Sequence, residues 1–232
     1  MMRLTRRIIV RAALALVGVF VIGATSPRAE AQLNGIDVSN YQGNVNWVSV
    51  KNAGYSFAFA KATEGTTYTD PYFAHNWYYM QQANIIRGAY HYGHPGSDPI
   101  AQARFFVTQV GNRSGAMQLV LDLETTDGRT PAQVWAWTQS FMAEIQRLTG
   151  KPGIIYTGYY FWRDSVGNPN NNLNCPLWIA NYGVSSPLVP TAWSTWSFWQ
   201  YSDTGSVPGV SGAVDKNYFN GTLTSLRALT FP

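Results

Sequence analysis

Eight short runs of apolar and aromatic residues recur along the chain, and helix-like segments lie between several of them. The runs are Gly35–Ser39, Tyr55–Ala62, Ile85–Tyr92, Gln118–Glu124, Gly153–Thr157, Leu177–Tyr182, Ser197–Ser202 and Ala213–Phe219. Strands that alternate with helices favour parallel β-α units, and eight such strands in one domain favour a barrel. Because the last connections are short for full helices, we expect an α/β fold, an incomplete or irregular (β/α) barrel in a single domain.

Three helices are predicted between these runs, over Pro71–Ala83, Pro99–Val110 and Pro131–Thr149. Each begins with a proline, which suits the first turn of a helix, and follows a residue that can cap the helix N-terminus. These capping residues are Asp70, Asp98 and Thr130. Gly150 follows the third helix and is a typical helix stop.

The first 31 residues have the pattern of a secretory signal peptide. Arginines precede an apolar stretch over 12–24, and Ala29 and Ala31 are small residues where a signal peptidase reads them. We therefore expect cleavage before Gln32 and a secreted, periplasmic or extracellular domain over 32–232. A membrane anchor is disfavoured because the apolar stretch is shorter than the roughly 20 residues that span a bilayer. The pair Arg6-Arg7 leaves a twin-arginine export route open.

The formal net charge of +4 comes from this predicted leader. The leader holds five of the 16 basic residues and one of the 12 acidic residues, so the remaining chain has eleven of each. A basic stripe is expected of a nucleic-acid-binding protein, and the sequence has none. We therefore expect no nucleic-acid partner.

Cysteine and histidine patterns indicate neither thiol nor metal chemistry. Cys175 is the only cysteine, which excludes an intramolecular disulfide, and its surroundings favour a small buried residue over a nucleophile. His75, His91 and His94 fit no zinc pattern, and the chain has no P-loop, GxGxxG or GxSxG motif. We expect no metal and no cofactor, which leaves carboxylates as the candidate reactive groups.

The fourth predicted strand ends in two carboxylates, Asp122 and Glu124. Side chains two apart in a strand point to the same face, about 7 Å apart along the backbone. Like charges this close raise one pKa, which makes a proton donor available near neutral pH, and glycoside hydrolysis uses two carboxylates with such split roles. A strand that simply runs out into solvent would show the same pattern.

Other predicted strands also end in acids and aromatic residues, where a β/α barrel builds its active site. Asp37 ends the first strand, Tyr90 lies near the end of the third, and Asp215 lies in the last. Aromatic residues form 15% of the chain, and aromatic planes pack well against the flat faces of sugar rings. The strand ends therefore predict a carbohydrate site.

Seven motifs make the chain resemble the glycoside hydrolase family 25 lysozymes, the Chalaropsis-type N-acetylmuramidases. In the family's order, they are Gly35-Ile36-Asp37-Val38-Ser39-Asn40-Tyr41-Gln42-Gly43, Phe59-Ala60-Lys61-Ala62-Thr63-Glu64-Gly65, Gly88-Ala89-Tyr90-His91-Tyr92, Leu121-Asp122-Leu123-Glu124, Leu177-Trp178-Ile179-Ala180-Asn181-Tyr182, Phe198-Trp199-Gln200-Tyr201-Ser202 and Val214-Asp215-Lys216-Asn217. Asn46-Trp47 departs from the family, where many members have an acid before the tryptophan. The resemblance spans nearly all of 32–232.

The resemblance implies an irregular, flattened (β/α) barrel that cleaves the β-1,4 bond between N-acetylmuramic acid and N-acetylglucosamine in peptidoglycan. Glu124 would be the general acid, and Asp122 would keep Glu124 protonated or orient the substrate's 2-acetamido group. That group would attack the anomeric carbon in a substrate-assisted retaining reaction. Asp37 and Asp215 would complete an acidic floor that stabilises positive charge.

The resemblance also suggests substrate-binding residues and a partner. The candidates for sugar contacts are Tyr90, Tyr156, Trp178 and Gln200, with Lys61 facing substrate carboxylates. The expected partner is the glycan strand of bacterial peptidoglycan. We also expect a monomer that has no membrane association after cleavage.

Two other functions stay open at this point. The first is a cell-wall-binding module without turnover, which the intact set of four acids disfavours. The second is a barrel glycosidase that acts on chitin, although the DxxDxDxE series of such enzymes is absent before Asp122.

Overall fold

All eight predicted strands are present in the computed structural model, which describes residues 32–170 and 172–232. They are β1 (Leu33–Val38), β2 (Tyr55–Glu64), β4 (Ile86–Tyr92), β5 (Val120–Asp122), β6 (Ile154–Gly158), β7 (Leu177–Ala180), β8 (Phe198–Gly205) and β9 (Val214–Phe219). A short strand that was not predicted, β3 (Tyr68–Thr69), pairs with the end of β2. The predicted leader lies outside the described residues, so its cleavage stays a prediction.

The strands close into one barrel in the order β1-β9-β8-β7-β6-β5-β4-β2, and β1 pairs with β2 to complete the ring. Neighbouring strands are parallel except for β9, which lies antiparallel between β8 and β1. A parallel return needs a crossover of a dozen or more residues, and the connection over 206–213 is shorter than that. The predicted irregular (β/α) barrel in a single domain is therefore confirmed.

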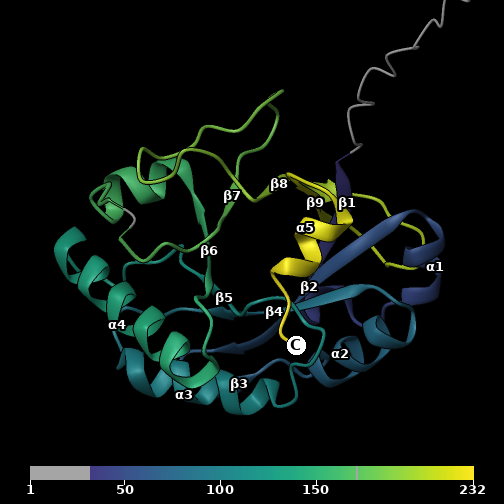
Figure 1. Cartoon of the computed structure of the whole chain (residues 1–232), viewed down its shortest axis with the longest axis horizontal. Helices are drawn as coiled ribbons and strands as arrows, with labels where there is room; N and C mark the ends of the chain where they lie inside the picture. Colours follow the sequence, from purple (N-terminus) through teal and green to yellow (C-terminus); the bar gives the residue numbers. More distant parts are fainter. Residues whose placement is uncertain (1–31, 171) are drawn as a thin grey trace, which may run out of the picture.

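The helices lie mainly on one side of this barrel. Figure 1 shows α1 to α4 as an outer layer, whereas the chain between β6 and β8 is mostly loop. The helices are α1 (Trp47–Asn52), α2 (Phe73–Gln82), α3 (Pro99–Val110), α4 (Pro131–Thr149) and α5 (Leu223–Ala228), with short turns η1 (Asn40–Gln42) and η2 (Phe161–Ser165). No helix in the described ranges is both long and apolar enough to cross a lipid bilayer.

Two of the three predicted N-caps are confirmed, and the third is wrong. Asp98 and Thr130 accept hydrogen bonds from the first turns of α3 and α4. Asp70 instead lies before the start of α2, whose N-cap is Tyr72. Its carboxylate accepts from the backbone N–H groups of Tyr72 and Asn40, and so ties η1 to the start of α2.

Strand β2 shows how the sequence divides the inside of the barrel from the outside. Phe57 and Phe59 pack in the barrel interior, while the alanines between and after them face the helices. Gly88 on the neighbouring strand β4 makes room for these rings, because a Cβ there would lie 2.3 Å from the Phe59 ring. Leu226 of α5 packs into the same interior cluster and closes its lower end.

The inner positions change from apolar to polar toward the carboxyl ends of the strands. In the chain around β5, Leu121 and Leu123 pack on the outer cluster and Val120 in the inner one. Since strand side chains alternate, Asp122 and Glu124 continue the inner face. The carboxyl groups of Asp122 and Glu124 therefore lie at the barrel mouth, next to the apolar core.

Candidate active site

Two adjoining cavities open at the carboxyl ends of the strands. The outer one has a volume of about 460 Å³ and the deeper one about 80 Å³, and both are lined by the four predicted catalytic acids and Tyr90. Lys61 lines the outer cavity, and Tyr156, Trp178 and Gln200 line the deeper one. The structure thus brings all nine predicted site residues together.

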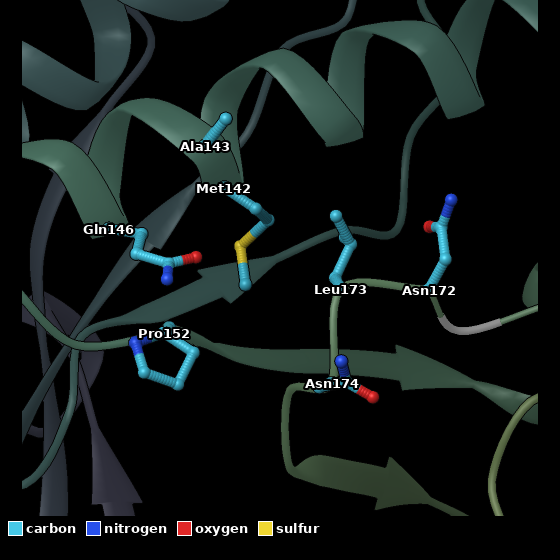
Figure 2. A pocket seen from close by; sticks show the side chains of 8 residues that line it. Met142, Ala143, Gln146, Pro152, Asn172, Leu173 and Asn174 are labelled. Atoms are coloured by element: carbon cyan, nitrogen blue, oxygen red, sulfur yellow. The ribbon is translucent and has the colours of Figure 1, made fainter.

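A third cavity of about 270 Å³ lies elsewhere, between α4 and the loop around 172–174 (Figure 2). Its lining includes Met142, Gln146 and Leu173 and contains no acidic or basic side chain. It contains none of the predicted site residues, so the barrel mouth is the candidate active site.

Asp37 is the most heavily hydrogen-bonded of the four acids. Gln200 Nε2 donates to both carboxylate oxygens at 3.1 and 2.9 Å, and Asn217 Nδ2 donates to Oδ2 at 2.7 Å. Burial raises the pKa of Asp37, and these amide hydrogen bonds act against that rise. They favour the ionised form, so we assign the negative charge of the cluster to Asp37.

The two amides cannot turn away from Asp37, because their oxygens are also occupied. Asn217 Oδ1 accepts from the Trp178 indole at 2.7 Å. Gln200 Oε1 accepts from the hydroxyls of Tyr156 at 2.8 Å and Tyr182 at 2.5 Å. Trp178, Tyr156 and Gln200 are thus engaged in holding Asp37, a role that the sequence did not predict for them.

Asp215 lies directly beside Asp37. The two residues are partners in the antiparallel pairing of β1 with β9. Burial, followed by the charge of Asp37, raises the pKa of Asp215 to about 8. The charge on Asp37 therefore favours a proton on Asp215.

Asp122 and Glu124 differ in their access to the cavity. Asp122 is 6% exposed, and among the described residues no group donates to its Oδ1. Burial and then the charge of Glu124 raise its pKa well above the ordinary value, against the effect of Lys61. Glu124 is exposed to the cleft, and partial desolvation by the surrounding protein, with the charge of Asp37, raises its pKa as well.

Lys61 is already paired in this structure. Its Nζ lies 2.6 Å from Glu64 Oε2, and it also lies over the ring of Tyr92 at 5.1 Å from the ring centre. A substrate carboxylate would therefore have to compete with Glu64 for this lysine.

Several residues of the site were not predicted. Tyr41, Glu64, Tyr92 and His94 line the outer cavity, and Asn217 holds Asp37. Two signals could have found some of them. Glu64 and Tyr92 end β2 and β4, and Asn217 lies two positions from Asp215 on the same face of its strand. Within the described residues, no group of three or more potential ligands is placed to hold a metal ion.

The raised pKa of Asp215 predicts a pH-dependent effect of Asp215→Asn on stability. Because the pKa is higher in the folded state than in the unfolded chain, wild-type stability falls as pH rises from about 4 through about 8. We expect the variant to be more stable by about 1–2 kcal/mol near pH 9, allowing for solvent screening, and to match wild type near pH 4. Urea unfolding at both pH values measures this, and an equal change at both would contradict it.

Curated relatives and solved structures resemble this chain over nearly the whole barrel. Lysozyme M1 of Streptomyces globisporus is 43% identical over 214 residues, which cover 88% of this chain and 73% of that protein. An N,O-diacetylmuramidase of Chalaropsis is 34% identical over 212 residues, which cover 85% of this chain and 98% of that protein.

The crystal structure of a bacterial lysozyme from Streptomyces coelicolor has a TM-score of 0.82 and 42% identity, covering 87% of this chain and 98% of that one. A family GH25 lysozyme from Aspergillus fumigatus has a TM-score of 0.80 and 34% identity, covering 87% of this chain and all of that one, 100%. The sequence profile of the glycosyl hydrolases family 25 matches residues 36–210. With this match across most of the barrel, the chain belongs to the glycosyl hydrolases family 25 and is a glycoside hydrolase of the lysozyme type.

Proposed function

We propose that this enzyme hydrolyses the β-1,4 bond between N-acetylmuramic acid and N-acetylglucosamine in bacterial peptidoglycan. One observation carries the proposal: four carboxyl groups from β1, β9 and the end of β5 line one cleft, and burial raises the pKa of each. Its relatives, a lysozyme and a muramidase, support this choice of substrate.

Glu124 is proposed as the general acid that protonates the leaving glycosidic oxygen. It is the exposed member of the Asp122–Glu124 pair, so a bound glycan can reach its carboxyl group. Burial and the charge of Asp37 raise its pKa, which favours the protonated form that a general acid requires.

Asp122 is proposed to orient the 2-acetamido group of the substrate. Asp122 lines the cavity, and its Oδ1 is buried without a donor among the described residues. A buried polar atom is unfavourable until it is paired. An acetamido group beside it would supply that partner. Held there, the acetamido oxygen attacks the anomeric carbon as the glycosidic bond breaks and Glu124 protonates the leaving oxygen. Water then attacks the same carbon from the opposite face and reopens the ring formed by the acetamido group, so the configuration is retained without a protein nucleophile.

Asp37 and Asp215 are proposed to stabilise the positive charge that develops on the sugar ring. Asp37 keeps its negative charge because three amide hydrogen bonds fix it. A fixed charge aimed at a site where opposite charge develops lowers the barrier without reorganisation.

Sugar binding is proposed to involve the walls of the cleft more than its floor. Tyr90 lines both cavities, and Tyr41 at the rim is 88% exposed, which leaves its ring free to pack on a sugar face. Tyr156, Trp178 and Gln200 act indirectly, through Asp37. Lys61 is proposed to attract substrate carboxylates in exchange with Glu64.

Export is proposed to depend on residues 1–31. The arginine-rich and apolar segments with Ala29 and Ala31 support cleavage before Gln32, and β1 begins immediately afterwards at Leu33. The mature chain would then act outside the membrane as a monomer, with no nucleic-acid partner. N-terminal sequencing of the exported protein checks the cleavage site.

Glu124→Gln is expected to reduce the rate by about 100- to 10,000-fold with the fold intact, because glutamine cannot donate the required proton. The mature protein and the variant are incubated with purified peptidoglycan, and the new ends are reduced with borohydride and identified by mass. Unchanged circular dichroism serves as the control for folding.

Reduced muramic acid from wild type and almost none from the variant would support both assignments. Reduced glucosamine would contradict the proposed bond, and near-normal activity of a folded variant would contradict the role of Glu124. Binding without new ends would favour a wall-binding module, and preference for chitin would favour the other glycosidase.

De-N-acetylated muramic acid is expected to be a poor substrate, because it lacks the acetamido oxygen that attacks in the proposed mechanism. The measurement compares initial rates on the same peptidoglycan before and after enzymatic de-N-acetylation. Equal rates on the two substrates would exclude assistance by the acetamido group.

A further inference from the structure

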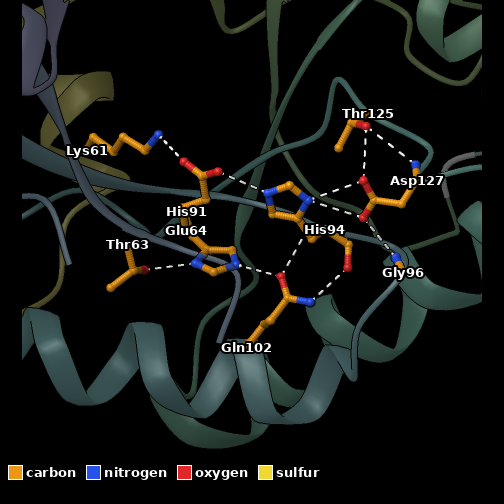
Figure 3. Close-up of polar contacts among 9 residues, drawn as sticks. All are labelled: Lys61, Thr63, Glu64, His91, His94, Gly96, Gln102, Thr125 and Asp127. Atoms are coloured by element: carbon orange, nitrogen blue, oxygen red, sulfur yellow. Dashed lines mark hydrogen bonds and ion pairs between the residues drawn. The ribbon is translucent and has the colours of Figure 1, made fainter. Parts of the chain in front are cut away.

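A chain of alternating charges crosses the rim of the cleft beside the four acids (Figure 3). Lys61 Nζ lies 2.6 Å from Glu64 Oε2, and the other oxygen of Glu64 lies 3.0 Å from His94 Nε2. The second ring nitrogen, His94 Nδ1, lies 3.2 Å from both oxygens of Asp127. One imidazole thus joins a carboxylate at the end of β2 to a carboxylate in the loop after β5.

Both ring nitrogens of His94 face a carboxylate, so His94 can donate to both carboxylates only when it is protonated. A neutral imidazole has one N–H donor, whereas the imidazolium has two. Burial would lower the pKa of His94, but the hydrogen bonds to Glu64 and Asp127 outweigh it and raise that pKa. At Glu64 the hydrogen bonds from Lys61 and then His94 outweigh burial and lower the pKa. At Asp127 the hydrogen bonds from the Gly96 N–H and then His94 do the same.

Asp127 anchors the loop that follows the proposed general acid. It lies three positions after Glu124 and adopts a left-handed backbone conformation, with φ of 47°. Its carboxylate accepts from the Gly96 N–H at 2.9 Å and from the Thr125 hydroxyl at 3.2 Å, besides His94. These contacts therefore hold Asp127 in a left-handed backbone conformation that is uncommon for residues other than glycine.

The start of the same loop is fixed independently by β6. Leu123 N donates to Tyr156 O at 3.0 Å, and the Thr157 hydroxyl donates to Leu123 O at 3.1 Å. Glu124 thus lies between a strand-fixed residue and the Asp127 anchor. Its exposed side chain has no hydrogen-bond partner in the described structure, so the backbone must position it.

We propose that His94 is a positioning residue that holds Glu124 in place by bridging Glu64 and Asp127. The proposal rests on the proposed function only in taking Glu124 as the general acid. The bridge forms when His94 is protonated, and it weakens as pH rises through the pKa of His94. Loss of the bridge would free the segment 125–128 and misplace the proton donor, since small displacements of a catalytic group lower the rate steeply.

The pH dependence of the bridge involves charged groups from β2, β4 and the loop after β5. The titratable and charged groups near His94 are Lys61 and Glu64 of β2, His91 and Tyr92 of β4, and Asp127 and Arg129 of the loop after β5. His91 stays neutral, because burial lowers its pKa to about 4, and it hydrogen-bonds Thr63 and Gln102 instead. The α3 side chain at this point, Gln102, is uncharged and contacts the His94 backbone.

Hydrogen exchange of the segment 125–128 tests the bridge without relying on activity. In wild type, corrected for intrinsic exchange, protection is expected to be high near about pH 5 and to fall on going to about pH 9. In His94→Gln it is expected to be about tenfold lower near pH 5 and to lose this pH dependence. His75→Gln, which changes a histidine of α2 outside the cleft, is the matched control and should behave as wild type.

Kinetics on a soluble glycan fragment separate positioning from binding. His94→Gln is expected to lower kcat about tenfold and to change KM by less than about twofold. Asp127→Asn also weakens the acceptor for Gly96 and Thr125, so it should lower kcat at least as much. The double variant should be no worse than Asp127→Asn, because both single variants remove the same bridge. Additive effects, or wild-type exchange and kcat in His94→Gln, would overturn the proposal.

The two proposals can fail separately. If wild type releases no reducing ends, the proposed function fails, while the exchange data still decide whether His94 orders the loop. If wild type is active and the segment 125–128 is equally protected in His94→Gln, only the positioning role fails.

Discussion

Four carboxyl groups cannot all be ionised at one partly buried barrel mouth, and this constraint governs the rest of the site. Desolvation and mutual repulsion raise the pKa of each acid, and only Asp37 receives amide donors that favour its charge. The charge of Asp37 therefore favours the protonated forms of its neighbours. At the floor of the cleft, Trp178 and Tyr156 donate hydrogen bonds to the oxygens of these amides. The amides therefore cannot rotate away from Asp37.

The barrel supplies this arrangement through simple alternation along its strands. Phe59 and Val120 fill the interior, and the next inner positions on the same strands are Lys61 and Asp122. Small outer residues and inner glycines such as Gly88 let the large rings pack below. Polar groups thus lie over a dense apolar core that limits access of water from beneath. This explains why burial dominates the pKa shifts at the mouth.

Local periodicity and strand ends predicted the strands, the three helices and the acids at the barrel mouth. The family resemblance supplied Lys61, Tyr156, Trp178 and Gln200 as sugar-binding candidates, and these residues line the same cavities. Sequence reasoning did not predict contacts between side chains that are far apart in the sequence. Asn217 and Asp37 are 180 positions apart in the sequence, and His94 and Asp127 are 33 positions apart. The Asp70 cap was wrong because the helix begins later, and its carboxylate serves η1 as well. Helices α1 and α5 are short and lack a strong periodic signal.

The pairing of the first strand with the last has a consequence for biosynthesis. Asp37 emerges early during translation, whereas its register partner Asp215 and its donor Asn217 lie in the final strand of the barrel. Such contacts between chain ends slow folding and cannot form on a ribosome that has not finished β9. A polypeptide that ends before β9 therefore lacks both Asp215 and the Asn217 amide that donates to Asp37.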